Sequence, residues 1–323
     1  MPVTVYKSTD ASAPVLNGQA GSLITVLDAI LVNGYVGKTA AGWTKPFSGT
    51  NLAAYKPGAG SQEYLRVDDT GSGAYAAGRE AFLRGYEAMT AISTGTGPFP
   101  TTAQLTNGCF FHKSPTADTT AIPWIAVADS RTLYFFVYTG LYAGYSAFVF
   151  GDFYSVKGVS DSYRTVLICR TIQETTGSST AQFYIPTAGN EMLEQLCGVQ
   201  TYLAGHYTPR TWDGLQTATL LGKHGNAAHS ASILAGLMSY PNNYDNAVYL
   251  SQVWLHESAT TPIIRGRLRG FWHFLHPVGV KINDGDTWSG TGALAGKTFM
   301  AIKPTSMGNG IYVMETSDTW ETN

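Results

Sequence analysis

The chain has 323 residues, enough for one large domain or two ordinary ones with a sizeable hydrophobic core. Charged residues make up 13% of it, about half of the roughly 25% usual in globular proteins, and the net charge is −2. These values argue against a nucleic-acid-binding surface, since Arg265, Arg267 and Arg269 form the only local cationic cluster in the sequence. A polar but weakly charged surface favours β structure and large protein–protein contacts.

The first fourteen residues, MPVTVYKSTDASAP, place the apolar residues Val3, Val5 and Tyr6 between two prolines. This stretch predicts either an arm that adds a strand to a neighbouring subunit or the first strand of the chain's own domain. It lacks the basic start and apolar run of an export signal, so we expect a protein that is made and assembled inside a cell.

The most regular apolar run is GSLITVLDAILVNGY, residues 21–35. Its apolar residues recur at helical spacing and predict an amphipathic helix over residues 22–33, about three turns long. Ser22 is the expected N-cap, and Asn33-Gly34 is the expected end. The uncharged part is shorter than the ~20 residues of a membrane span, and Asp28 interrupts it, so we expect no membrane span.

Most of the remaining chain shows short runs of aromatic and β-branched residues bounded by turn-forming residues, which predict strands. These runs are residues 63–69, 80–89, 122–129, 131–140, 145–153, 163–172, 247–255, 298–302 and 310–318. Asp129-Ser130 predicts a tight hairpin between two of them, although the preferred glycine is missing. Residues 93–108, STGTGPFPTTAQLTNG, predict a long ordered loop or a surface arm.

Together these signals predict a mainly β (α+β) protein with antiparallel, sandwich-like sheets and one N-terminal helix. We expect an N-terminal lobe over residues 1–172 and a C-terminal β-rich lobe over residues 182–323. The stretch QETTGSSTA at 173–181 is the linker candidate, and a single-domain arrangement remains an alternative. Residues 190–197, NEMLEQLC, predict one short helix.

Two loop motifs come close to cofactor or metal sites. GTGALAGKT, residues 290–298, approaches a phosphate-binding loop, but its glycines are one position out of place and a strand-like run follows. NDGDTW, residues 283–288, fails the calcium-loop pattern and predicts an ordinary Asx turn. We therefore expect no cofactor.

Histidines and cysteines form no complete metal motif in the sequence. The spaced histidine pairs are His224 with His229 and His273 with His276, and neither pair belongs to an HExxH motif. The isolated, odd-numbered cysteines predict reduced, buried thiols, and they are Cys109, Cys169 and Cys197. We expect packed histidines and no metal site.

Hydrolytic chemistry has no local signature here, because no G-x-S-x-G elbow occurs. Two glycosidase carboxylates can lie far apart in a chain. The candidates, all equally readable as turn residues, are Asp68, Asp69, Asp152 and Asp213. The tryptophans that suit either sugar stacking or core packing are Trp43, Trp124, Trp212, Trp254 and Trp288. No residue is assigned a catalytic role, and we expect a non-enzymatic protein.

Several phrases of the chain share the character of one protein family. The longest covers residues 8–58, from STDASAPVLNG to AAYKPG. Others are YLRVDD, RGYEAM, TGTGPFPT, WIAVADSRTLYFFV, FVFGDFYSVKGVSDSY, RGRLRGFWHFLHP and IYVMETSDTW. Together they resemble uncharacterised virion structural proteins of tailed bacteriophages. One departure is Val36, which stands before Gly37 where the family has glycine directly after the tyrosine.

The resemblance implies a structural component of the virion, assembled in the host bacterial cytoplasm, in the tail, tail tip, baseplate or collar rather than decorating the capsid. The implied partners are other virion proteins and copies of the chain itself, with no nucleic acid. One alternative is a carbohydrate-binding or polysaccharide-degrading adsorption protein that contacts a host-surface glycan. A cytoplasmic enzyme with a perturbed acid or base is the other.

Overall fold

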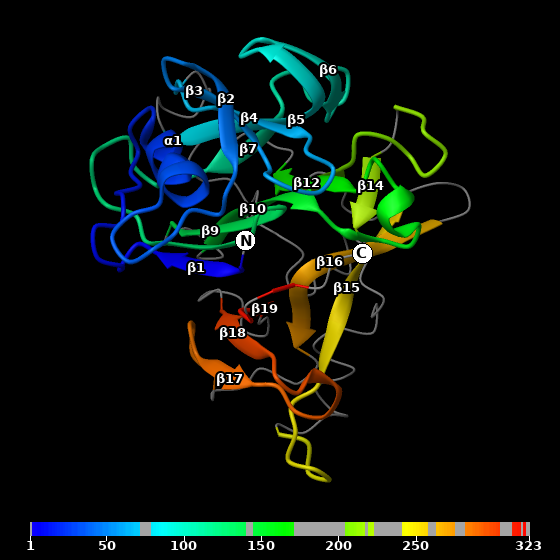
Figure 1. Cartoon of the computed structure of the whole chain (residues 1–323). Helices are drawn as coiled ribbons and strands as arrows, with labels where there is room; N and C mark the ends of the chain where they lie inside the picture. Colours follow the sequence, from blue (N-terminus) through cyan, green and yellow to red (C-terminus); the bar gives the residue numbers. More distant parts are fainter. Residues whose placement is uncertain are drawn as a thin grey trace.

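The computed structural model describes residues 2–71, 79–139, 145–170, 204–216, 219–222, 241–257, 263–274, 282–303, 312–317 and 319–320. Strands account for 47% of the structure and helices for 8%, and the strands pair in curled antiparallel sheets (Figure 1). The predicted mainly β class, with antiparallel sheets and a short N-terminal helix, is confirmed.

The expected helix is present and has the expected length. It begins as the α-helix α1 (Ser22–Leu27) and continues as the π-helical segment η1 (Asp28–Asn33). Gly34 ends it with a positive φ of 73°, and the Gly34 N–H donates to the carbonyl of Ala29 at 2.8 Å. The predicted end at Asn33-Gly34 is therefore confirmed.

The predicted N-cap is wrong. Gly21, in the left-handed region with a φ of 83°, precedes the helix, and Ser22 is already its first residue. The Ser22 hydroxyl donates to the carbonyl of Asn17 at 2.7 Å instead of accepting from the helix. The Leu23 N–H donates to the carboxylate of Asp69 at 2.9 Å, so the cap comes from a residue far along the chain.

One sheet packs against the helix, and most of its strands pair with the strand that follows them in the chain. Its members are β2 (Thr44–Gly49), β3 (Leu52–Lys56), β4 (Tyr64–Asp68), β5 (Glu80–Ala91), β6 (Thr94–Phe99) and β7 (Cys109–His112), with β5 between β4, β6 and β7. The expectation of a loop or arm over residues 93–108 is wrong for residues 94–99, which form β6. TGTGPF has no apolar run, but the long strand β5 offers it a pairing partner, and tertiary pairing overrides weak local propensity.

The central sheet has the spatial order β1-β8-β9-β10-β12-β13-β14. Its strands are β1 (Thr4–Lys7), β8 (Trp124–Ala128), β9 (Thr132–Tyr138), β10 (Tyr145–Asp152), β12 (Thr165–Arg170), β13 (Ala204–Tyr207) and β14 (Thr219–Gly222). Because β1 pairs with β8 of the same chain, the N-terminal stretch is the first strand of its own sheet and not an arm on a neighbour. The predicted β8–β9 hairpin forms, and Asp129 fixes its turn by accepting the N–H groups of Arg131 and Thr132, each at 2.8 Å.

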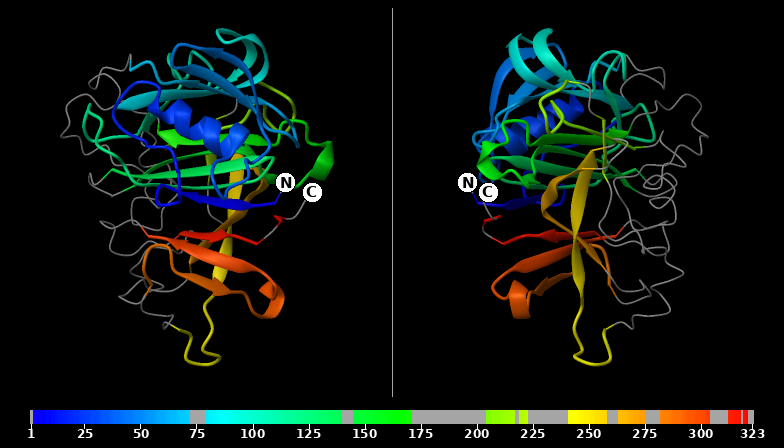
Figure 2. Two further views of the ribbon diagram at one scale, coloured as in Figure 1. Left: turned by 60° about the vertical axis from the view of Figure 1, so that its left-hand side comes forward. Right: turned by 90° about the vertical axis from the view of Figure 1, so that its right-hand side faces the viewer.

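The C-terminal strands continue from β14 in the order β15-β16-β19-β18-β17. They are β15 (Leu250–Glu257), β16 (Ile263–Phe274), β17 (Thr287–Ser289), β18 (Thr298–Ile302) and β19 (Tyr312–Glu315). The short β11 (Tyr154–Ser155) pairs with β16, and two 3₁₀ turns are η2 (Gly158–Ser160) and η3 (Gly292–Leu294). Figures 1 and 2 show β15 and β16 running from the central sheet toward the far end of the molecule, where β17 and a loop before β15 lie.

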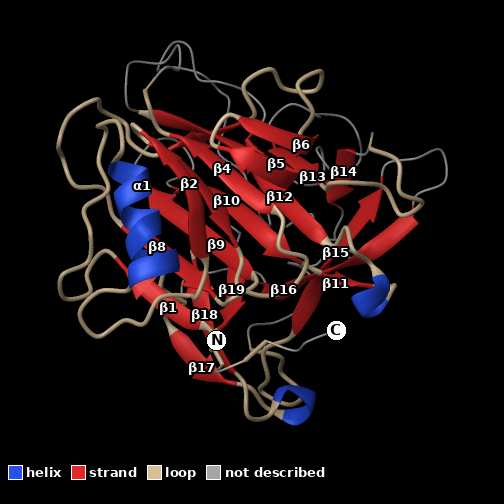
Figure 3. Cartoon of the chain, turned by 45° about the horizontal axis from the view of Figure 1, so that its top comes forward, coloured by secondary structure: helices blue, strands red, loops and turns tan. Residues whose placement is uncertain are grey.

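The central sheet is buried on both faces. Along β9, Leu133, Phe135 and Val137 join the core under the helix and the β2–β7 sheet. The alternate residues Tyr134 and Phe136 join a second core shared with the C-terminal strands. Figure 3 shows the central strands β9, β10 and β12 between β4 and β5 on one side and β18 and β19 on the other. Burial on both faces explains why TLYFFVY reads as one continuous apolar run.

The linker candidate at 173–181 and the short helix expected at 190–197 lie outside the described residues. The strands on the two sides of this region pair with each other, since β12 precedes it, β13 follows it, and the two are hydrogen-bonded neighbours. The second core also combines residues from both sides, such as Ile168 and Leu268.

Candidate functional site

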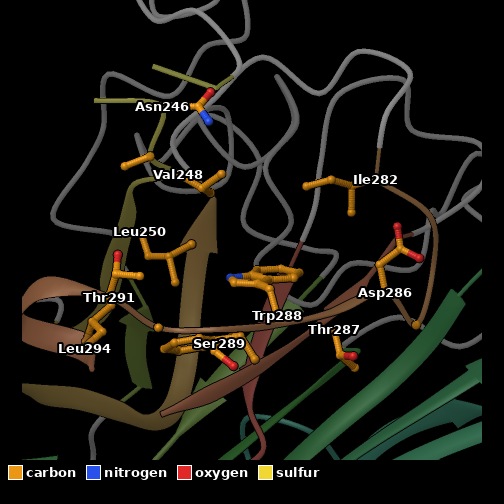
Figure 4. Close-up of a pocket in the computed structure, with 14 residues that line it drawn as sticks. Asn246, Val248, Leu250, Ile282, Asp286, Thr287, Trp288, Ser289, Thr291 and Leu294 are labelled. Carbon is orange, nitrogen blue, oxygen red and sulfur yellow. The ribbon is translucent and has the colours of Figure 1, made fainter. Parts of the chain in front are cut away.

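A pocket of about 700 Å³ lies at the far end of the C-terminal strands, within the roughly 300–1,000 Å³ typical of small-molecule sites (Figure 4). It is lined by the loop before β15, the start of β15, the β17–β18 hairpin and the turn before β17. The lining residues are Asn246, Ala247, Val248, Leu250, Ile282, Gly285, Asp286, Thr287, Trp288, Ser289, Gly290, Thr291, Leu294 and Phe299. The indole of Trp288 lies in the middle, between Leu250 on one side and Ile282 on the other.

The β17–β18 hairpin sets the position of Trp288. Trp288 stands opposite Phe299 in the strand register, and the two rings stack with centroids 6.3 Å apart and an interplanar angle of 27°. Gly290 begins the connecting turn, where a Cβ would lie 2.1 Å from the carbonyl oxygen of Leu294. This close approach explains one glycine of GTGALAGKT. Strand β18 begins at Thr298, so the segment lacks the helix that a phosphate-binding loop needs.

The loop before β15 forms the other wall. Its Asp245 carboxylate accepts hydrogen bonds from the side-chain amide of Asn242 at 2.8 Å and from the N–H of Ala247 at 3.0 Å. These contacts hold Asn246 in a left-handed conformation with a φ of 53° at the pocket rim. Tyr244, on the same loop, has 96% of its surface exposed.

The polar groups of the pocket are amide, hydroxyl and carboxylate groups. Asp286 is the one charged residue among the described residues that line it. The Asp286 carboxylate accepts the N–H of Asn283 at 2.7 Å, and Asp284 accepts the N–H of Lys303 at 2.9 Å, so both acids of NDGDTW hold backbone turns. A stacking ring with a polar, weakly acidic rim can bind a polyhydroxylated ligand.

The carboxylates proposed for hydrolysis lie in separate networks. Asp69 is fully buried and accepts a hydrogen bond from Lys113 at 2.5 Å, and that ammonium also donates to the carbonyl of Gln19 and to the hydroxyl of Ser22. Burial raises the pKa of Asp69 to about 6, and Lys113 opposes the shift. The other three each have a local partner: Asp68 with Arg66, Asp152 with Arg164 and Asp213 with Thr211. None of these pairings resembles two acids facing each other across an open cleft.

The structure brings Asp152 together with Glu63, a residue that the sequence analysis missed. The Ser61 hydroxyl donates to Asp152 and lies 2.5 Å from the Thr165 hydroxyl, which donates to Glu63. Burial raises the pKa of Glu63 from 4.5 to about 7. Both carboxylates are almost completely buried, so a polymer cannot reach them, and the hydrogen bonds of the cluster join the chain before β4 to the ends of β10 and β12.

The alternation of β4 carries a signal that would have found Glu63. Glu63 and Asp69 are in phase with Leu65 and Val67, and all four are buried. An acid on the apolar face of an alternating strand is a predicted buried acid, whereas Asp68 on the other face is half-buried.

The tryptophans divide between core and surface. Trp43 and Trp124 are buried, and both indole N–H groups donate to backbone carbonyls, so core packing holds for these two. Trp254 is half-buried on β15, as is Trp288 in the pocket, while Trp212 is 45% exposed.

Histidines and cysteines form no metal site in the part of the chain that the structure describes, where no group of three His, Cys, Asp or Glu side chains could hold an ion. His273 lies on β16, and His224, His229 and His276 lie outside the described residues. Cys109 and Cys169 are buried free thiols, as expected, and burial raises the pKa of Cys169 to about 12. Cys197 lies outside the described residues.

In the arginine cluster of β16, Arg265 and Arg269 are buried and Arg267 is half-buried. Arg269 makes a two-pronged ion pair with Asp129 at 2.7 and 3.0 Å, and Arg265 pairs with Asp161 at 2.8 Å. Arg267 lies over the ring of Tyr154, 5.0 Å from its centroid. These contacts join β16 to the central sheet and its neighbouring turns, so the cluster does not form a cationic surface.

Five exposed apolar side chains lie on three neighbouring segments beside β11, and we call this group the β11 patch. Its members are Val156, Val159, Trp212, Leu215 and Ile264, between 45% and 69% exposed. Hydrogen bonds join the three segments that carry them: Val156 N–H donates to the Arg265 carbonyl at 2.8 Å, and Arg265 donates to the Arg210 carbonyl at 3.0 Å. Lys157 also lies over the Trp212 ring, 5.4 Å from its centroid.

Neither a protein-family model nor a curated protein matches the chain. No helix in the described part of the chain is long and apolar enough to cross a membrane.

Proposed function

We propose that the chain is a non-enzymatic structural component of a tailed-bacteriophage virion, which assembles through contacts with copies of itself and with other virion proteins. The observation that carries the proposal is the β11 patch. Apolar side chains that gather on a surface mark protein–protein contact sites, whereas singly scattered ones need no explanation. The sequence resemblance to virion structural proteins supports the same function.

The charge distribution agrees with this proposal. Several ion pairs are spent inside the fold, such as Arg269 with Asp129 and Lys113 with Asp69. The surface is correspondingly poor in charge, since 13% of the residues are charged in all. A weakly charged surface with an apolar patch has a low desolvation cost when it is covered by a partner.

Within the virion we favour the tail, including its tip, baseplate or collar, over a capsid decoration. This preference rests on the resemblance alone. A copy number that is a multiple of three or six on the tail axis would support it, and hundreds of copies on the head would contradict it.

The test compares association before and after the patch is made polar. We expect the purified protein to form oligomers in sedimentation velocity, and Val159→Asp and Leu215→Asp to shift it toward monomers. Val36→Asp is the matched control, because Val36 is 65% exposed on a turn remote in sequence from the patch. A wild-type protein that stays monomeric at high concentration and is missing from purified particles by mass spectrometry would contradict the proposal.

A further inference from the structure

We infer that the pocket around Trp288 is a binding site for a neutral saccharide. The inference stands on the pocket and is independent of the β11 patch, which lies on other segments of the chain. It commits to one chemical class, an uncharged oligosaccharide presented in solution or on a surface.

The indole ring of Trp288 supplies an apolar stacking face in the pocket. Trp288 is half-buried at the centre of the pocket and is backed by Phe299, so its orientation is fixed before any ligand arrives. An aromatic face is a flat apolar surface with a negative quadrupole, which suits the C–H groups on one face of a pyranose ring. Leu250 and Ile282 flank the indole and extend this apolar floor.

Polar side chains lie at the rim of the pocket. Asn246, Asp286 and Thr291 place amide, carboxylate and hydroxyl groups around the same opening, whereas Thr287 and Ser289 point to the other face of β17. An amide presents two donors and one acceptor oxygen, and a carboxylate accepts through both oxygens, so these groups can pair with neighbouring sugar hydroxyls that act as both donors and acceptors. A polar rim around an apolar floor is the arrangement that gives a small-molecule site its specificity.

The charge of the lining residues bears on which class of sugar the pocket can bind. Asp286 is the one charged group among the described residues that line the pocket, and it is acidic. An anionic ligand, such as a phosphate, a nucleotide or an acidic sugar, would be repelled by this carboxylate, whereas the ammonium of Lys303 beside the pocket already donates to the carbonyl of Ile282 at 3.0 Å. The charge of the described lining residues therefore favours a neutral saccharide over an acidic one.

Hydrogen bonds within the chain order both walls of the pocket before a ligand binds. The hydrogen bonds of Asp245 to Asn242 and Ala247 fix the loop that carries Asn246. Those of Asp286 to Asn283 and of Asp284 to Lys303 fix the opposite turn. Walls that are already ordered lower the conformational cost of binding. The exposed ring of Tyr244, on the first loop, offers a second stacking surface outside the pocket.

The experiment is a screen of the purified full chain on an array of neutral and acidic oligosaccharides, followed by isothermal titration with the best-bound neutral glycan. Isolated cell-wall glycan and free oligosaccharides form separate arms, which distinguishes a surface polymer from a small sugar. We expect binding to neutral glycans, and loss of the stacking face in Trp288→Ala is expected to weaken it about tenfold or more. Trp288→Tyr should retain part of the affinity.

Val36→Ala is the control, because it shortens an exposed apolar side chain that belongs to neither the pocket nor the β11 patch. If Trp288→Ala fails to fold by circular dichroism, Asn246→Ala and Asp286→Asn at the rim replace it and should each weaken binding. The inference is overturned if the wild type binds no neutral glycan, if acidic glycans bind more tightly, or if the pocket variants bind as well as Val36→Ala. Association through the β11 patch is measured separately, so failure of one proposal leaves the other intact.

Discussion

The central sheet and the far end of the C-terminal strands use aromatic residues in opposite ways. In the central sheet, Tyr134 and Phe135 are completely buried on opposite faces of β9. At the far end, Trp288 is half-buried in an open pocket and Tyr244 is 96% exposed. A sheet covered on both faces cannot present its side chains to another molecule. Recognition by this chain must therefore come from the surfaces and loops around the sheet.

The largest effect expected from this comparison is in the central sheet. Phe135→Ala removes a ring that packs against Phe111, Trp124 and Phe148, and a rigid sheet covered on both faces cannot close the cavity. We expect the free energy of unfolding to fall by about 3–5 kcal/mol. Urea denaturation measures this loss, and a loss below about 1 kcal/mol would contradict the two-sided packing.

The ion pair between β16 and the β8–β9 hairpin is the next place to test. Arg269→Met leaves Asp129 buried without its cation, and we expect a loss of about 3 kcal/mol in urea denaturation. Lys45→Met is the control, since its pair with Asp28 is about one quarter exposed and its loss should cost at most about 1 kcal/mol. Equal effects of the two substitutions would remove the distinction between interior and surface pairs.

The third prediction concerns pH. Glu63 has a pKa of about 7 in the folded chain and about 4.5 as its ordinary value, so the folded state holds this proton more tightly. Its contribution to stability is complete below about pH 4.5 and is lost as the pH rises to about 7, by up to about 3 kcal/mol.

Glu63→Gln, which cannot ionise, should remove this part of the pH dependence and be more stable than the wild type at pH 8. His206 contributes the opposite slope, because burial lowers its pKa to about 4. The measurement is therefore the difference between wild type and variant in urea denaturation from pH 4 to pH 8. A difference that does not change with pH would show that Glu63 does not hold a proton.

The smallest effect is expected at the β11 patch. Leu215 is 59% exposed, so Leu215→Ser should change the free energy of unfolding of the monomer by at most about 0.5 kcal/mol. Thermal unfolding at low protein concentration checks this. A large loss would mean that the side chain supports the fold rather than a partner.

The sequence predicted the buried framework well because that framework is written in local pattern. The apolar run TLYFFVY and the helical spacing of residues 22–33 each indicate their own structure. The strands β4, β8, β9 and β10 likewise lie within runs that predicted strands, residues 63–69, 122–129, 131–140 and 145–153.

The missed features depend on partners that are distant in the sequence. Strand β6 exists because β5 pairs with it, and Asp69 caps the helix at Leu23, 46 residues earlier. The pocket combines Asn246 with Trp288 through a fold that local spacing does not encode. Glu63 is the exception, since the alternation of β4 did contain its signal.

The helix is capped by Asp69, a residue outside the helix, and this bears on the order of folding. Leu23 receives its acceptor from Asp69, and Asp69 is held by Lys113, which also binds the turn before the helix. The start of the helix is therefore complete only after three segments separated by more than forty residues have met. A peptide of residues 15–36 alone should be largely unstructured by circular dichroism, and the helix should consolidate late, together with the sheet that supplies its cap.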